Sequence, residues 1–262
     1  QPKGTELAAF IRLCRKYDVP YQVIGNGSNL LVGDRGIRGL VIEMLSKEDE
    51  ICVEDDCITV GAGMLLSKTA NRAAEHGLTG MEFAAGIPGR IGGAVVMNAG
   101  AYGGEMKDIL TAVTVLDQEG NEKILSAEEL ELGYRTSCIL KKGYIVTGAK
   151  IKLKHGEETA IRARMEELKK QRVEKQPLEY PSAGSTFKRP EGYFAGKLIM
   201  DAGLRGYLVG EAQVSEKHCG FVINRGNATA ADVRTLMQNV ADIVEEKFGV
   251  RLEPEVKMIG EF

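Results

Sequence analysis

The sequence lacks the features that mark membrane, metal-binding and disulfide-stabilised proteins. Its 262 residues contain no run of about 18 apolar residues, which excludes a transmembrane helix. The five cysteines are odd in number and form no C-x-x-C motif, which argues against a disulfide framework or a structural zinc site. The three histidines form no H-x-x-x-H or H-E-x-x-H pattern. We therefore expect a cytoplasmic protein that has no metal and no contact with a membrane.

The chain also has only a small excess of charge of one sign. The formal net charge is −3, so the chain has no overall field that would attract nucleic acid. With 44% hydrophobic and 27% charged residues, the composition is ordinary for a globular protein of one large domain or two to three smaller ones. Gln1-Pro2-Lys3-Gly4-Thr5 is neither an apolar signal segment nor a start methionine, so we expect that the chain begins inside a longer gene product.

Glycine, in contrast, is concentrated in the stretch from Gly86 to Gly104. Seven of these nineteen residues are Gly, and only Arg90 is charged. Such a density lowers stability unless the backbone must approach a ligand or adopt positive φ. Exposed N–H groups in such loops suit anionic oxygens, most often phosphate. The stretch therefore predicts a cradle for a nucleotide cofactor; the alternative is a set of tight turns and close helix–sheet packing.

A second glycine loop follows the expected strand 20–24. It runs Gly25-Asn-Gly-Ser-Asn-Leu30, with Asn and Ser side chains that can bond within their own turn. It is not a Rossmann fingerprint, because the third glycine and the following long helix are missing. Two such loops together indicate a pyrophosphate held from two sides, as in a dinucleotide.

Hydrophobic periodicity and turn residues predict mixed helices and short strands without a regular βαβ repeat, which indicates an α+β fold. A capping box at Ser126–Glu129 predicts a short helix, and the helix 229–248 is expected to be capped at Asn227 or Thr229 and to end at Gly249. Helices are expected at 6–17, 64–76, 157–175, 194–202 and 229–248, and strands at 20–24, 39–43, 51–60 (a hairpin), 110–116 with 123–125 (a hairpin), 144–153, 221–224 and 250–259.

Three side chains are candidates for chemistry, each with a structural alternative. Ser185 follows Gly184 in a turn and precedes the cation Lys188 by three residues, so it is the most reactive hydroxyl or else a turn serine. Arg135 could clamp a carboxylate or phosphate, or it is a surface arginine. Glu255 lies in the expected last strand, where a carboxylate facing solvent is the alternative.

Taken together, these segments resemble one family. The chain is similar to the UDP-N-acetylenolpyruvoylglucosamine reductases, the MurB flavoenzymes of peptidoglycan precursor synthesis. The matching segments cover nearly the whole chain in family order: 23–32, 86–93 with 97–103, 133–137, 183–188, 201–206, 214–218, 224–229 and 253–256.

The resemblance implies a fold, a division into domains and two nucleotides. The fold would be an FAD-binding fold of the vanillyl-alcohol-oxidase/PCMH type, with two α+β subdomains, followed by an α+β substrate-binding domain. The FAD-binding region would span 1–155 (subdomains about 1–45 and 46–155), the substrate-binding domain 156–258, and the C-terminal tail 259–262. NADPH would reduce FAD, which would then reduce the enolpyruvyl group of UDP-N-acetylglucosamine enolpyruvate to UDP-N-acetylmuramate for the cell wall. We expect a monomer with a UDP-sugar as substrate.

Site residues carry over from the same resemblance. Ser185 stands at the proton donor, and Arg135 and Glu255 stand at the residues that polarise the enolpyruvyl carboxylate and stabilise the enol-like intermediate. Tyr134 and Lys188 would contact the substrate. The expected cofactor-binding residues are Gly25, Asn26, Gly27, Ser28, Asn29, Leu30, Gly86, Ile87, Pro88, Gly89, Ile91, Gly92, Gly93, Asn98, Ala99 and Gly100.

The sequence departs from the family pattern in two places. The family's opening strand and Thr-x-Arg-x-Gly-Gly segment, which contribute to the FAD site, have no counterpart here. The part after Ser185 is compact, which predicts the shorter family type without the extra insertion in the substrate domain. The rival interpretations are another flavin oxidase of the same superfamily and a non-catalytic protein that binds a flavin or UDP-sugar.

Overall fold

The computed structural model describes residues 4–46 and 50–262, and its chain divides into two compact units. The N-terminal unit comprises Gln1–Asn26 and Gly39–Lys170, and the C-terminal unit comprises Gly27–Arg38 and Gln171–Phe262. The expectation made from the first five residues concerns a segment of which residues 1–3 lie outside the described part of the chain. The domain ranges that the sequence predicts stay a prediction.

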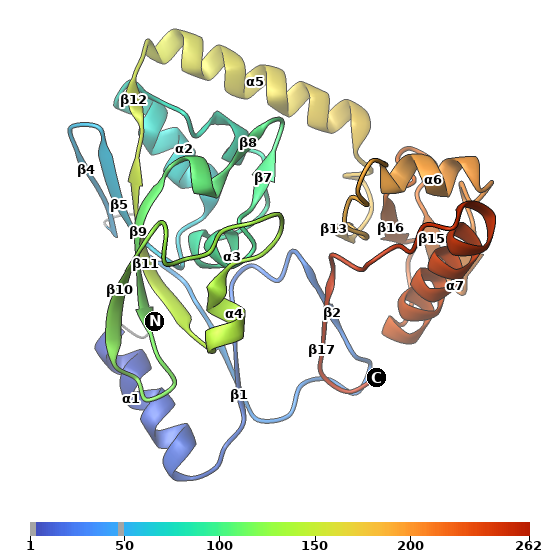
Figure 1. Cartoon of the computed structure of the whole chain (residues 1–262), viewed down its shortest axis with the longest axis horizontal. Coiled ribbons are helices and arrows are strands. Elements are labelled where there is room, and N and C mark those ends of the chain that lie inside the picture. The colour runs from blue at the N-terminus through green and yellow to red at the C-terminus, as the bar shows by residue number, and fades with distance from the viewer. Residues whose placement is uncertain (1–3, 47–49) are drawn as a thin grey trace. The chain divides into compact units, whose positions relative to one another are not determined.

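The N-terminal unit is built on a five-stranded antiparallel sheet in the order β10-β9-β11-β5-β4 (Figure 1). Both predicted hairpins are confirmed, because β4 pairs with β5 and β9 pairs with β10. The first hairpin turns at Asp55, whose φ of 53° is in the left-handed region. The strands are β4 (Ile51–Glu54), β5 (Cys57–Gly61), β9 (Leu110–Leu116), β10 (Glu122–Ser126) and β11 (Ile145–Lys152).

Helices and short segments cover this sheet and form its core. The helices α2 (Leu66–Glu75), α3 (Ile91–Val96) and α4 (Cys138–Lys142) contribute buried apolar side chains, together with the 3-10 helices η2 (Glu82–Ala84) and η3 (Met106–Asp108). The unit also contains two short antiparallel pairs: β6 (Leu78–Thr79) with β12 (Lys154–His155), and β7 (Gly100–Ala101) with β8 (Gly104–Glu105).

A smaller cluster joins the helix α1 (Gly4–Lys16) to the parallel strands β1 (Tyr21–Ile24) and β3 (Leu40–Glu43). Leu7 and Ile11 of α1 pack with Ile42 and Leu116. The guanidinium groups of α1 also donate to the turn after β9, since Arg12 Nη2 lies 2.9 Å from the carbonyl of Gly120. In that turn Asp117 accepts the N–H of Asn121, which lowers the pKa of Asp117 to about 2. Both apolar packing and hydrogen bonds therefore hold α1 against the strands β1, β3 and β9.

The C-terminal unit contains a four-stranded antiparallel sheet in the order β13-β16-β15-β14. The helix α7 packs against β14 and β15 and against α6, and these elements enclose a core of their own. β2 pairs in parallel with β17 in the same unit. The elements are β2 (Leu30–Val32), β13 (Ser182–Ser185), α6 (Ala195–Asp201), β14 (Leu208–Val209), β15 (Ala212–Val214), β16 (Phe221–Asn224), α7 (Ala230–Phe248) and β17 (Lys257–Ile259).

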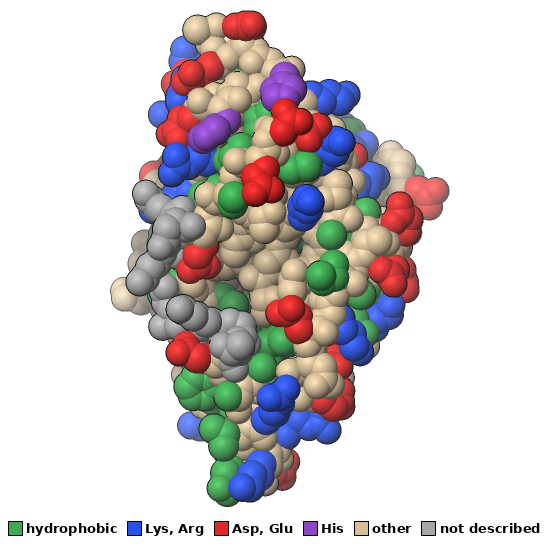
Figure 2. Space-filling view, turned by 90° about the vertical axis from the view of Figure 1, so that its left-hand side faces the viewer, with side chains coloured by type: hydrophobic (Ala, Val, Ile, Leu, Met, Phe, Trp, Pro, Cys, Tyr) green, Lys and Arg blue, Asp and Glu red, His purple; other side chains and the backbone are tan. Residues whose placement is uncertain are grey.

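The charged helix α5 (Glu158–Lys175) is confirmed close to its predicted bounds (Figure 1). Only Ile161 and Leu168 of this helix are buried. Glu166 forms an ion pair of 3.6 Å with Lys169. Basic and acidic side chains are also interspersed on the face of the molecule that Figure 2 presents. No described helix is both long and apolar enough to cross a membrane.

Four predictions of secondary structure are wrong or incomplete. The turn expected at Gly184 and Ser185 is the end of the strand β13. The last strand covers only 257–259, because the residues before it bond to 186–188 instead; Lys188 N–H donates to the carbonyl of Glu253 at 2.8 Å. The capping-box contacts of Ser126 and Glu129 form, yet the residues after Ser126 make a turn and not a helix. The helices α3 and α4 were not predicted, and α3 contains two glycines, so packing rather than helix propensity stabilises it.

The N-terminus of α7 is capped twice. Thr229 Oγ1 accepts the N–H of Asp232 at 3.0 Å, and the Asp232 carboxylate accepts the N–H of Thr229 in return. The carboxylate of Asp34 accepts the next two N–H groups, those of Ala230 and Ala231. These bonds satisfy donors that the helix itself cannot use, and they fasten the segment 27–38 to the C-terminal unit.

We predict that Thr229→Ala lowers the free energy of unfolding by about 1 kcal/mol, because it removes one side of the capping box. For a chain of this size the melting temperature should fall by roughly 2–4 °C. Asn227→Ala is the matched control, because the cap is Thr229 and not Asn227. A larger loss in the Asn227 variant than in the Thr229 variant would contradict this assignment.

Candidate active site

The glycine-rich stretch 86–104 passes from η2 into α3 and ends in the β7–β8 hairpin. Its backbone is bonded to the segment before α2 at two points. Ile91 N–H donates to the carbonyl of Met64 at 2.9 Å, and Gly92 N–H donates to the carbonyl of Ala62 at 2.8 Å. The start of α3 is therefore held by main-chain bonds from a neighbouring segment.

Five glycines of this stretch fall into two groups. A Cβ on Gly92 would lie 3.1 Å from the Ala62 side chain, and one on Gly104 would lie 2.6 Å from the Phe83 ring. Gly100 is equally tight, with the carbonyl oxygen of Gly104 at 2.7 Å. Close packing therefore explains these three glycines, as the alternative interpretation of the sequence had it.

The second group has open space above the backbone. A Cβ on Gly93 or Gly103 would meet no described atom within 4 Å, apart from its chain neighbours and, for Gly93, the backbone of its own helix; Gly103 also has a φ of 89°. Gly93 does not have a positive φ, so conformation alone does not require glycine there. An accessible backbone at this point fits a ligand that approaches α3 closely, such as the phosphates of a dinucleotide.

Arg90 connects the stretch to the glycine loop 25–30. Its side chain lies along Gly25, and its Nη1 donates to the carbonyl of Gly63 at 2.7 Å. Glu43 lies 3.8 Å from Nη2, while the buried Nε has no hydrogen-bond partner among the described residues. The Asn26 amide adds a bond of 3.4 Å to the carbonyl of Pro88. No local motif indicates this role of Arg90, although it is the one charge in the stretch 86–104.

Residues 27–30 of the glycine loop 25–30 belong to the C-terminal unit. The Asn29 amide donates to the carbonyl of Glu255 at 3.3 Å, and the carbonyl of Asn29 accepts the N–H of Lys257 at 2.9 Å. These bonds continue into the parallel pair of β2 and β17. The expected cofactor-binding residues 25–30 are thus divided between the two units, with Gly25 and Asn26 in the first and the others in the second.

Thr186, the residue after Ser185, holds Ser185 near the segment that carries Glu255. Thr186 is 2% exposed; its N–H donates to the carbonyl of Gly220, and its carbonyl accepts the N–H of Glu255 at 2.9 Å. Its Oγ1 accepts the N–H of Val222 at 2.8 Å. Thr186 therefore holds the end of β13, where Ser185 is exposed, beside the segment that carries Glu255.

Lys188 lies close to this pair in the chain and is half-buried. Its Nζ forms an ion pair of 3.0 Å with the exposed carboxylate of Glu253. An exposed pair of this kind contributes little to stability. The cation is accordingly available to exchange Glu253 for an anionic ligand, which is consistent with the predicted contact to the substrate.

Arg135 and Tyr134 belong to the N-terminal unit. Arg135 has φ of 53° and sits in a tight turn that Gly133 and Thr136 close with reciprocal main-chain bonds. Its Nη2 donates to the carbonyl of Gly100 at 3.0 Å, and its guanidinium lies 5.0 Å from the centre of the Tyr134 ring. The structure thus places Arg135 against the end of the glycine-rich stretch.

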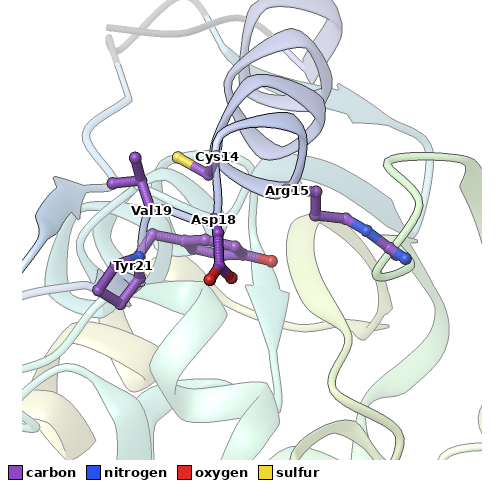
Figure 3. A pocket seen from close by; sticks show the side chains of 6 residues that line it. Cys14, Arg15, Asp18, Val19 and Tyr21 are labelled. Carbon is purple, nitrogen blue, oxygen red and sulfur yellow. The ribbon is translucent and has the colours of Figure 1, made fainter.

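A shallow pocket occurs elsewhere in the N-terminal unit, between the end of α1 and β1 (Figure 3). Its volume is about 500 Å³. Burial raises the pKa of the Tyr21 phenol in this pocket. None of the expected site residues belongs to its lining, which consists of Cys14, Arg15, Asp18, Val19, Pro20 and Tyr21.

Comparisons with known proteins identify the family of the chain. A family model described as "FAD binding domain" matches residues 3–126, and one described as "UDP-N-acetylenolpyruvoylglucosamine reductase, C-terminal domain" matches residues 176–259. A reductase of that name from Agathobacter rectalis is 58% identical over 100% of this chain and 87% of its own length. The chain belongs to the UDP-N-acetylenolpyruvoylglucosamine reductase (MurB) family.

Further relatives support the same membership. A reductase of that name from Lachnoclostridium phytofermentans is 59% identical over 99% of this chain and 85% of its own length. The crystal structure of the MurB reductase from Thermus caldophilus superposes with a TM-score of 0.82 at 40% identity, covering 98% of this chain and 90% of that chain. The predicted fold class, an FAD-binding α+β region followed by the MurB C-terminal domain, is confirmed.

We predict that Thr186→Val lowers the free energy of unfolding by about 1–3 kcal/mol, because the buried N–H of Val222 loses its acceptor. Valine has nearly the same shape, so the effect reports on the hydroxyl. The control is Thr186→Ser, which keeps the hydroxyl and loses only a methyl group. Urea unfolding of both variants measures the difference; a Val variant as stable as wild type would show that Thr186 does not fasten this corner.

Proposed function

We propose that this chain is an NADPH-dependent flavoprotein oxidoreductase that reduces the enolpyruvyl group of UDP-N-acetylglucosamine enolpyruvate to UDP-N-acetylmuramate, a step of peptidoglycan precursor synthesis. The observation that carries the proposal is the fixed placement of Ser185 beside Glu255, within a chain of the MurB family. The names of the relatives and the FAD-binding domain support the same reaction.

Two features of the N-terminal unit support the binding of FAD there. Its glycine-rich stretch leaves the backbone open at Gly93 and Gly103, and Arg90 supplies a cation between the stretch and Gly25. When bound, FAD supplies the hydride-transfer chemistry between NADPH and the substrate. The expected cofactor-binding residues are part of this proposal, apart from Asn98, which is fully buried and whose amide is bonded within the protein.

Ser185 is proposed as the proton donor. Addition of hydride to one alkene carbon leaves negative charge on the other carbon and on the neighbouring carboxylate, and the reaction is completed by a proton. The Ser185 hydroxyl is exposed at the end of β13, where it can reach a bound substrate. Serine is a weak acid in water, so it needs cationic or polar help from its neighbours.

Arg135 and Glu255 are proposed to stabilise the charge that develops. A guanidinium is always protonated and can bind a carboxylate through two parallel hydrogen bonds. Such a group, held in place before the reaction, lowers the energy of a charged intermediate more than that of the neutral alkene. Lys188 and Tyr134 would bind other parts of the UDP-sugar. We further propose that the enzyme is a monomer and acts in the cytoplasm.

The first test measures cofactor and substrate together. The purified protein, supplemented with FAD, should show flavin absorption and should oxidise NADPH rapidly only when the enolpyruvyl UDP-sugar is present. Flavin binding without any response to this substrate would favour another flavin oxidase of the superfamily. Binding of the UDP-sugar without any NADPH oxidation would favour a non-catalytic binding protein. Both outcomes contradict the proposal.

The second test addresses the proton donor. Ser185→Ala should leave the reduction of FAD by NADPH unchanged and should slow reoxidation by the UDP-sugar by roughly 10²–10⁴-fold, the usual contribution of a general acid. Stopped-flow absorption at the flavin band measures the two half-reactions separately. Ser182→Ala is the matched control, since Ser182 is an exposed serine of the same strand β13. Equal effects on both half-reactions would overturn the role of Ser185.

A further inference from the structure

We propose that Asn98 is a positioning residue that sets the direction of the Arg135 guanidinium. It does so by fastening the turn that carries Arg135 to the β7–β8 hairpin. The inference rests on the proposed function, because it gives Asn98 a role through Arg135 and not through direct contact with substrate. All the residues from which it is argued lie in the N-terminal unit.

The Asn98 side chain is fully buried, and its hydrogen bonds are made within the protein. Its Nδ2 donates to Oε2 of Glu105 at 2.7 Å and to the carbonyl of Gly133 at 2.9 Å. Its Oδ1 accepts the N–H of Lys107 at 2.8 Å. Both amide N–H groups and the amide oxygen thus have protein partners. The side chain therefore links the β7–β8 hairpin, η3 and the turn at Gly133.

This link holds Arg135 at both of its ends. The backbone end is fixed because Gly133, which Asn98 bonds, closes the four-residue turn with Thr136. The guanidinium end is fixed because Nη1 lies 3.5 Å from the carbonyl of Asn98 and Nη2 lies 3.0 Å from the carbonyl of Gly100. A change at residue 98 therefore moves both the turn and the acceptors of the guanidinium.

The backbone conformation supports the same role. Asn98, Tyr102 and Arg135 have φ values of 42°, 53° and 53°, in the left-handed region that side chains other than glycine rarely adopt. Such conformations persist where the surrounding contacts over-determine them, and they gather at functional sites. Asparagine tolerates this region better than most residues. The residue at position 98 thus needs both a positive φ and an amide side chain that forms three hydrogen bonds.

Glu105 keeps the Asn98 amide in its orientation. Its carboxylate accepts from Asn98 and also forms an ion pair of 2.5 Å with the Lys107 ammonium. Its N–H donates to the Asp108 carboxylate at 3.0 Å, in the capping box of η3. The acceptor for Asn98 is therefore itself held by two further groups, so the amide cannot turn without breaking several bonds.

The test compares Asn98→Gly with wild type in the two flavin half-reactions. Glycine keeps the positive φ and removes the amide. We expect reoxidation by the enolpyruvyl UDP-sugar to slow by roughly tenfold to a hundredfold, the loss that a small misplacement of a catalytic group produces. The affinity for FAD and the rate of reduction by NADPH should not change. Asn71→Asp, at an exposed asparagine on α2, is the control and should match wild type.

A double variant with Arg135→Lys separates positioning from other roles. If Asn98 acts through Arg135, Asn98→Gly adds no further loss in the Arg135→Lys background. Multiplicative losses, an unchanged rate in Asn98→Gly, or an equal loss of FAD affinity would each overturn the inference. Should Asn98→Gly fail to fold, Asn98→Asp replaces it, because aspartate keeps the acceptor for Lys107 and tolerates the same φ.

A spectroscopic measurement keeps the inference distinct from the proposed reaction. In nitrogen-15 spectra assigned with Arg135→Lys, the Arg135 guanidinium of wild type should show resolved, slowly exchanging Nη signals. Asn98→Gly should average them. Identical signals in both proteins would overturn the positioning role even if the reaction is as proposed. Suppose instead that the wild-type protein does not oxidise NADPH in response to the UDP-sugar, while its Nη signals are still averaged by Asn98→Gly. This result would contradict the proposed reaction and support the positioning role.

Discussion

The close approach of main chain to main chain around α3 is the constraint on which the N-terminal unit depends. The first N–H groups of α3 bond to carbonyls of the segment 62–64, and this close approach favours a residue without a side chain at Gly92. Gly104 makes the same allowance for the Phe83 ring. With these contacts in place, the short helix forms despite its two glycines, and it presents the open backbone of Gly93. Glycine here serves packing on one side and accessibility on the other.

The C-terminal unit uses the same kind of bond for a different purpose. Through its own N–H and carbonyl, Thr186 attaches the end of β13 to Gly220 and to Glu255. The exposed ion pair of Lys188 with Glu253 adds little rigidity, because surface pairs are screened by solvent. Buried hydrogen bonds of the backbone, not surface charges, therefore place the proposed chemical groups in both units. The side chains that act can then remain exposed to a substrate.

Much of the local structure could be predicted from local signals. The hairpins at 51–60 and 110–125, the charged helix α5 and the capped helix α7 follow from alternation, helical spacing, capping residues and glycine stops. Signals of this kind failed where packing decides. The residues 250–256 favour a strand, but they bond to Thr186 and Lys188, and Ser126 with Glu129 forms its capping contacts without a helix. Arg90 and Thr186 carry no local motif that would reveal their roles.

The sequence by itself determined the family, the α+β class and the identity of the candidate residues, because each matching motif is contiguous and can be recognised without knowing its neighbours in space. Only the tertiary structure decided which glycines are packed and which are open, that the loop 25–30 is shared by two units, and that Thr186 joins Ser185 to Glu255. It also decided that Asn98 is a buried link and not an exposed loop residue. These properties depend on contacts between residues far apart in the chain, and no local pattern encodes such contacts.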